Sequence, residues 1–175
     1  MNLKPYWAYF CYVFRHKVAV FKECWKLGLF WRGITHDLSK FSPAEFGAYA
    51  RHFYDEKGAK KPFDHQQDTS FDYALNDHLR RESHHWQHWI LLHDDGVTKA
   101  LPIPEKDRLE MLADWLSFGG YGRLKEWYQR NKGKMILHPE TRAWIEVQLG
   151  LEEEGSGRYQ RPVKNRYKRT FRIRR

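Results

Sequence analysis

The sequence predicts an all-α, single-domain protein. Apolar residues recur at helical spacing in several segments, residues that start and stop helices flank those segments, and strand-like alternation is nowhere sustained. With 175 residues, the chain has the size of one domain and can bury a sizeable core. We therefore expect a bundle of about five to seven helices.

The first expected helix covers residues 6–30. Large apolar residues such as Trp7 and Phe14 recur there near the helical period, and Gly28 or Gly33 would close the helix.

Two further helices are expected directly after it. A short one covers residues 35–40, and the next begins after Ser42, which is typical of an N-cap. Pro43 suits the first helical position, and Glu45 stands where a capping box places its carboxylate. This helix would continue to about Tyr54.

The remaining expected helices alternate with polar connections, namely a loop at residues 55–69 and a turn at residues 94–96. The helices are 71–89 with a break near 80–83, 104–118 before a Gly-Gly pair, 121–131, and 139–149 with Gly150 as its stop.

The net charge of +9 belongs to the end of the chain. From Arg158 onward there are nine Lys and Arg and no acid, which leaves 22 basic residues to balance 22 acidic ones. We expect residues 1–151 to form the domain and residues 152–175 to form a linker and basic tail. The tail has two interpretations, a nucleic-acid-binding segment or a solubilising extension. The candidate phosphate contacts are Arg158, Arg161, Lys164, Arg166, Lys168 and Arg169.

A cytoplasmic location is expected. The most apolar stretch, Tyr6 to Phe30, is interrupted by charged residues, so it cannot span a bilayer, and it lacks a small-residue cleavage site. Cys11 and Cys24 would lie about 20 Å apart along one helix, beyond disulfide reach, and are expected to be buried thiols in a reducing compartment.

Ten histidines are present, and several stand near acidic residues that are expected to be internal. On one helix, His36 and Asp37 would point about 100° apart and could hold one ion from two sides. Imidazole and carboxylate ligands together suit Zn, Mn, Fe, Ni, Co or Mg.

These residues resemble a known motif. The order His16, His36-Asp37 and Asp114 is similar to the H…HD…D signature of the HD-domain superfamily of metal-dependent phosphohydrolases. Residues 36–40 (HDLSK) resemble its HDxGK segment. The chain also resembles small uncharacterised phage and bacterial proteins with an HDLSK-type segment. The resemblance covers roughly residues 10–120.

The resemblance implies an HD-like bundle that binds one or two divalent ions and hydrolyses a nucleotide or related small phosphate ester with a metal-activated water. It implies metal ligands at His16, His36, Asp37 and Asp114, with His78 and either His84 or His85 adding to a second metal or a phosphate site. It implies catalytic roles for Lys40, His84 and Glu110.

The sequence also allows other interpretations. His16 could be a structural histidine, and Asp114 could pair with an arginine while Glu110 took its place. His84 and His88, four residues apart, could form a ligand pair in place of His85. The rival function is a non-catalytic nucleic-acid-binding or scaffold protein that uses its tail.

Overall fold

A computed structural model describes residues 2–62 and 68–151 and confirms the all-α class. Over these residues it contains seven α-helices, three short 3-10 helices and one two-stranded hairpin. The α-helices are α1 Lys4–Lys26, α2 Phe30–Thr35, α3 Pro43–Phe53, α4 Thr69–Arg81, α5 Glu105–Ser117, α6 Gly120–Asn131 and α7 Pro139–Leu149. The 3-10 helices are η1 Leu38–Phe41, η2 Trp86–Trp89 and η3 Lys132–Lys134, and the strands are β1 Ile90–Leu92 and β2 Thr98–Ala100.

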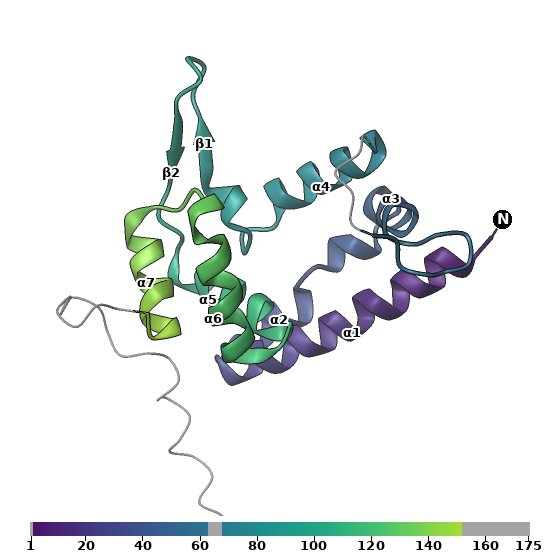
Figure 1. Cartoon of the computed structure of the whole chain (residues 1–175), viewed down its shortest axis with the longest axis horizontal. Coiled ribbons are helices and arrows are strands. Elements are labelled where there is room, and N and C mark those ends of the chain that lie inside the picture. Colours follow the sequence, from purple (N-terminus) through teal and green to yellow (C-terminus); the bar gives the residue numbers. More distant parts are fainter. Residues whose placement is uncertain (1, 63–67, 152–175) are drawn as a thin grey trace, which may run out of the picture.

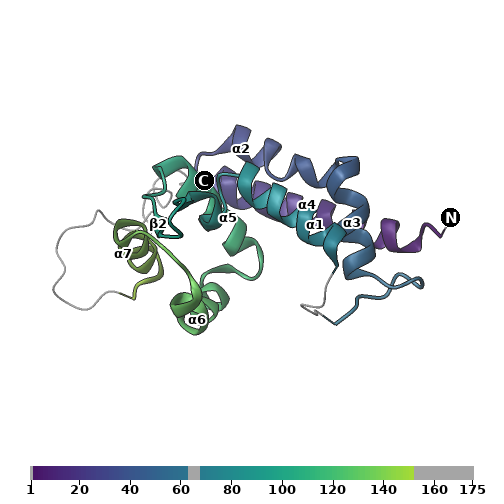
Figure 2. The ribbon, with the colours of Figure 1, turned by 90° about the horizontal axis from the view of Figure 1, so that it is seen from above.

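The long helix α1 runs along the molecule, and the other helices gather at its two ends (Figures 1 and 2). Helix α3 packs on α1 and α4 at the end nearer the N-terminus, whereas α2 and α5 pack on α1 toward its other end. Helices α6 and α7 and the hairpin lie beyond α5, and the hairpin projects away from the bundle (Figure 1). The chain between α2 and α3 and the chain between α4 and α5 therefore meet near the middle of α1.

The buried apolar residues form separate clusters on either side of this middle region. One cluster, at the end nearer the N-terminus, includes Tyr9 and Tyr49. On the other side, a small cluster of Val20, Cys24 and Ala113 joins α1 to α5, and a larger one includes Met111 and Trp144. His16 falls in α1 between these two packed regions, which hold the helices in place around it.

The connection from α1 to α3 differs from the prediction. Helix α1 ends at Lys26, and Gly28, with φ 75°, lets the chain turn into α2. The helix expected over 35–40 does not form, because α2 ends at Thr35 and η1 begins only at Leu38. His36 and Asp37 lie in the break between them.

The expected helix over residues 71–89 is also shorter than predicted. Helix α4 begins after Asp68, whose side chain accepts a hydrogen bond from Phe71 N, and it ends at Arg81. The chain then turns, forms η2 and enters the hairpin, whose strands pair antiparallel around the predicted turn. Three-residue strands are too short to show an alternating pattern, so the sequence did not indicate them.

The remaining helices lie where they were expected. Ser42 caps α3, and Gly150 ends α7 with φ 61°. Cys24 is buried and Cys11 partly exposed, and both are free thiols. Within the described chain, no helix has both the length and the apolar character needed to cross a membrane. The basic tail, with the six candidate phosphate contacts, and part of the 55–69 loop lie outside the described residues.

Candidate metal centre

Four predicted ligands from three segments converge near the middle of α1. His16 comes from α1, His36 and Asp37 from the break between α2 and η1, and Asp114 from α5. His16 Nε2 lies 3.1 Å from Asp114 Oδ1 and 3.9 Å from Asp37 Oδ2. His36 Nε2 lies 3.4 Å from Asp37 Oδ2 and 3.7 Å from Asp114 Oδ1. These four side chains form the first ligand group.

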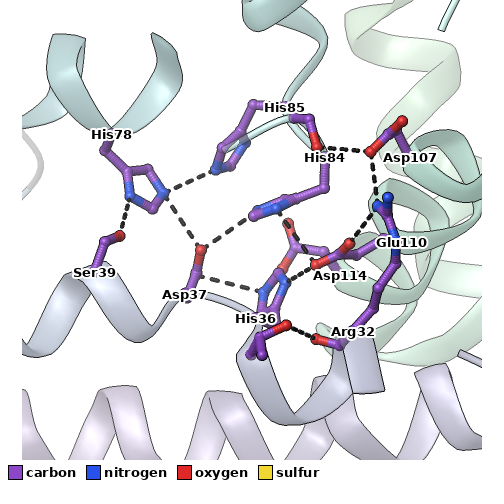
Figure 3. Close-up of polar contacts among 12 residues, drawn as sticks. Arg32, His36, Asp37, Ser39, His78, His84, His85, Asp107, Glu110 and Asp114 are labelled. Atoms are coloured by element: carbon purple, nitrogen blue, oxygen red, sulfur yellow. Dashed lines mark hydrogen bonds and ion pairs between the residues drawn. The ribbon is translucent and has the colours of Figure 1, made fainter. Parts of the chain in front are cut away.

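Three further histidines gather around the other oxygen of Asp37. His78 Nε2 and His84 Nε2 each lie 3.4 Å from Asp37 Oδ1, and His78 Nε2 lies 2.9 Å from His85 Nε2. Figure 3 shows Asp37 between His78 on one side and His84 and His36 on the other. The second ligand group is therefore Asp37, His78, His84 and His85, and Asp37 belongs to both groups.

The backbone of Asp37 produces this shared position. Its φ of 53° makes it the one non-glycine residue with a left-handed backbone among residues 2–62 and 68–151. Aspartate tolerates this conformation better than most residues, and such strain concentrates at functional sites. Lys17 Nζ donates to the carbonyls of Ile34 and His36 at 2.7 Å, which fixes the break against α1. The prediction that His36 and Asp37 share a helix was wrong, because this left-handed residue interrupts it.

The donor set fits a divalent ion. Two ligands about 2.1 Å from one ion lie about 3.0 to 3.4 Å apart in octahedral or tetrahedral sites, and two of the four distances in the first group fall in this range. Several buried atoms of the described chain have no hydrogen-bond partner, and four of these face one another across the two groups. They are His36 Nε2, Asp37 Oδ1, His84 Nε2 and Asp114 Oδ1. These atoms lie at ion-pair distances from one another or from His16 without forming hydrogen bonds, and a bound cation would supply each of them with a partner.

Glu110 supports the centre from behind His36. Its Oε1 lies 3.0 Å from His36 Nδ1 and 3.6 Å from His84 Nδ1, so both imidazoles turn their Nε2 atoms toward Asp37. Arg32 Nη1 donates to Glu110 Oε2 at 2.9 Å and to Asp107 Oδ1 at 2.7 Å. Carboxylates in this position fix the ring and tautomer of a metal-binding histidine. Glu110 thus lies where it orients ligands, although the sequence suggested a catalytic role.

A second carboxylate supports the other histidine group. Glu45 is buried, and its Oε2 lies 3.0 Å from His78 Nδ1, while Ser39 Oγ lies 3.2 Å from the same nitrogen. Arg81 Nη2 lies 3.2 Å from Glu45 Oε1. Sequence reasoning assigned Glu45 to a helix cap. The backbone N of Glu45 does bond Ser42 Oγ, but its carboxylate turns to His78 instead.

Lys40 approaches the centre from η1. Its Nζ lies 2.5 Å from Asp37 Oδ2, and its side chain is 18% exposed. Burial alone would lower the pKa of Lys40, but Asp37 and Asp114 outweigh this effect and raise it, so the ammonium stays charged. Lys40 therefore places a permanent positive charge at the edge of the site, where its side chain is partly exposed to solvent.

The buried charges shift one another's protonation. Burial alone would lower the pKa of His36, but the nearby Asp114, Glu110 and Asp37 carboxylates raise it to about 10. Burial alone would raise the pKa of Asp114, but His16 and His36 hold it below its ordinary value. Without metal, the His36 imidazole is thus protonated and lies in ion pairs with the neighbouring carboxylates.

The structure decides several alternatives left open by the sequence. Among the described residues, Asp114 faces His16 and His36 and not an arginine, whereas Arg32 pairs with Glu110 and Asp107. His84 and His88 do not share a helix face, because α4 ends at Arg81, and His84 lies beside His85 instead.

Sequence reasoning missed the supporting residues Arg32, Ser39, Asp107 and Ser117. Ser117 Oγ lies 3.3 Å from His16 Nδ1. In the sequence, these residues are marked only by lying within a few positions of the HDLSK segment or of Asp114.

The fold and the site together define a helical protein with a buried imidazole–carboxylate centre suited to divalent metal. The model of a family of unknown function, DUF5662, matches residues 5–151, so the chain belongs to this family. No curated protein and no solved structure is significantly similar to the chain.

Proposed function

We propose that this protein is a divalent-metal-dependent phosphohydrolase that acts on a small phosphate ester such as a nucleotide. The proposal is carried by one observation, the position of Asp37. Its two carboxylate oxygens face two separate groups of imidazoles, and the Lys40 ammonium lies beside one of them. Two adjoining cation positions beside the Lys40 ammonium suit a phosphate group, which carries several negative oxygens.

Some residues of the site would bind metal, and others would contact the substrate. His16, His36 and Asp37 would hold one ion together with Asp114, whose Oδ1 lies near both imidazoles. Asp37 with the second group of histidines would hold another. A divalent ion there lowers the pKa of a water molecule and offsets phosphate charge. His84 would act as a ligand through Nε2, because its Nδ1 faces Glu110.

Lys40 would contact the substrate. Its side chain is partly exposed and always charged, so it can move from Asp37 to a phosphate oxygen when substrate arrives. A cation that follows developing charge on phosphate accelerates the reaction more than one that binds only the ground state. The order of ligands along the chain is also similar to that of HD-domain phosphohydrolases, which supports the same reaction class.

The test combines metal analysis with a substrate screen. Protein purified without added ions is analysed for metal, then loaded with Mn, Co, Ni or Mg and assayed with p-nitrophenyl phosphate and nucleoside mono-, di- and triphosphates. Asp37→Asn should lose most bound metal and all measurable turnover. His93→Gln, at an exposed position beside the hairpin turn, is the matched control and should change neither. A wild-type-like Asp37→Asn variant would refute the proposal.

A further inference from the structure

A cavity of about 620 Å³ adjoins the metal centre. Asp114 of the first ligand group and His85 of the second line it, together with residues of η2, α5 and α6. This volume falls within the usual range for small-molecule sites. A ligand in this cavity can therefore reach both ligand groups.

Aromatic side chains form much of the wall, namely Trp86, Trp115, Phe118 and Trp127. Phe118 and Trp127 are 54% and 40% exposed, although both are large and apolar. The Trp115 and Trp127 rings meet edge to face, with centroids 5.4 Å apart. Phe118 stacks near His16, with centroids 4.9 Å apart, so the aromatic wall begins at the metal centre. Open aromatic faces of this kind bind flat heterocycles by stacking.

Two arginines line the same cavity. Arg123 and Arg130 lie seven residues apart on α6, about 10 Å along its axis, with Trp127 between them. Within residues 2–62 and 68–151, neither guanidinium has an acidic partner. Arg123 packs near Gly119, next to Phe118, and so lies toward the metal centre. Planar guanidinium groups without partners favour phosphate oxygens and the edges of bases.

An amide completes the polar lining. Gln87 borders the cavity, and its Oε1 is buried without a hydrogen-bond partner in the described chain. A primary amide offers one acceptor and two donors, which matches the edge of a nucleobase.

We infer that this cavity is a nucleoside phosphate site. The phosphate lies between Arg123 and the metal centre, the base stacks within the tryptophan wall, and Arg130 and Gln87 contact the base from the outer part of the cavity. The position of the phosphate rests on the proposed function, whereas the base and Arg123 contacts do not. A substrate without a ring, such as a phosphorylated sugar, would leave the aromatic wall uncovered.

The test measures binding of probes that cannot be hydrolysed. The full chain loaded with Mn²⁺ is titrated calorimetrically with the 5′-methylenephosphonate analogues of adenosine, guanosine, cytidine and uridine, in which a P–C bond replaces the ester bond. Methylphosphonate serves as the probe without a base. At least one nucleoside analogue should bind ten or more times more tightly than methylphosphonate. Equal affinities, or no binding by any nucleoside analogue, would overturn the inference.

Variants then locate the site. Trp127→Ala should weaken the best nucleoside analogue about tenfold, because stacking on one aromatic ring contributes that much. Arg123→Gln should weaken the phosphonate but not the uncharged nucleoside. Trp31→Ala, which removes a ring that is 74% exposed on α2, and Arg80→Gln on α4 are the matched controls and should bind normally. A Trp127→Ala variant that binds like Trp31→Ala would also overturn the inference.

The two proposals can fail separately. If the protein binds nucleoside analogues through Trp127 but hydrolyses no phosphate ester, the nucleotide site is supported and the proposed hydrolase activity is refuted. If the protein hydrolyses p-nitrophenyl phosphate but binds every analogue no better than methylphosphonate, the hydrolase activity is supported and the nucleotide site is refuted.

Discussion

Asp37 and Lys40 form an ion pair, with Lys40 Nζ 2.5 Å from Asp37 Oδ2, at the point where the two ligand groups join. Burial alone would raise the pKa of Asp37, but Lys40, His84 and His36 hold it well below its ordinary value. Lys40 therefore keeps Asp37 ionised before any metal arrives. The same ammonium is a cation that a metal would displace and a substrate could use.

Replacing Lys40 separates these two roles. Lys40→Gln should retain metal at wild-type stoichiometry, because it removes a competing cation and no ligand atom. Its kcat should fall about 100-fold, which is typical of losing one group that stabilises transition-state charge. Metal analysis and steady-state kinetics on the best substrate measure both quantities. A loss of bound metal together with activity would show that Lys40 only maintains the centre.

The sharing of Asp37 by two groups predicts the metal count. Wild-type protein should bind two ions per chain, and either His16→Gln or His85→Gln should reduce this to about one. His16 belongs only to the first group and His85 only to the second. Metal content after dialysis against a defined free-metal buffer gives the count, with His93→Gln as control. One ion in wild-type protein and none in either variant would indicate a single site.

Replacing Glu110 should lower the affinity for metal without removing a metal ligand. Glu110→Gln keeps the shape but weakens the hold on His36 Nδ1 and His84 Nδ1. Removing such a supporting carboxylate typically lowers metal affinity 10- to 100-fold. Activity should return at high metal concentration, which competition with a metal-binding dye can follow. Glu105→Gln, exposed on the same helix, is the control, and failure of excess metal to restore turnover would favour the catalytic role that the sequence suggested.

The sequence predicted helices well and their connections poorly. Ser42, Gly150 and the Gly-Gly pair after α5 are local signals, since Ser42 caps α3 with its side chain and the glycines adopt the positive φ at which a helix ends or turns. The break at His36–Asp37 has no such signal, because a left-handed aspartate is stabilised by contacts from α1 and by its place among the histidines. The hairpin was missed for a related reason, since its strands are too short to carry a period.

The candidate site was predictable only in part. His16, His36, Asp37 and Asp114 could be chosen from their order along the chain. Which histidines after α4 face Asp37 could not, because that depends on a turn at residues 82–85. Residues that support ligands or line the cavity, such as Arg32 and Trp127, are ordinary surface-helix residues in sequence. Tertiary packing alone gives them their positions.

The basic tail provides a separate prediction about the domain. A chain ending at residue 151 should fold, bind metal and hydrolyse substrate at rates within about twofold of the full chain, because every described ligand precedes that residue. Binding of nucleic acid, measured by fluorescence polarisation with labelled single-stranded DNA at low and high salt, should be lost if the tail carries it. A full chain that hydrolyses no phosphate ester and loses nucleic-acid binding on truncation would instead support the rival, non-catalytic function of the tail.

The protonation of His36 predicts that metal binding releases protons. In the metal-free centre, carboxylates raise the pKa of His36 to about 10 against the lowering effect of burial, so its imidazole is charged at pH 7.5. A metal binds only the neutral ring, and so it must displace that proton. Apparent affinity should therefore rise with pH, about tenfold per unit for one proton, and level off near pH 10. In metal-free protein the same charged ring stabilises the fold below about pH 6.5, and this contribution is lost as the pH rises through 10.

Calorimetric titration with Mn²⁺ at pH 7.5 in two buffers of different ionisation enthalpy counts the protons that metal binding releases. About one or more per ion is expected, fewer should be released in Asp114→Asn because the imidazolium loses a partner, and none in wild-type protein would show that His36 is neutral before metal binds.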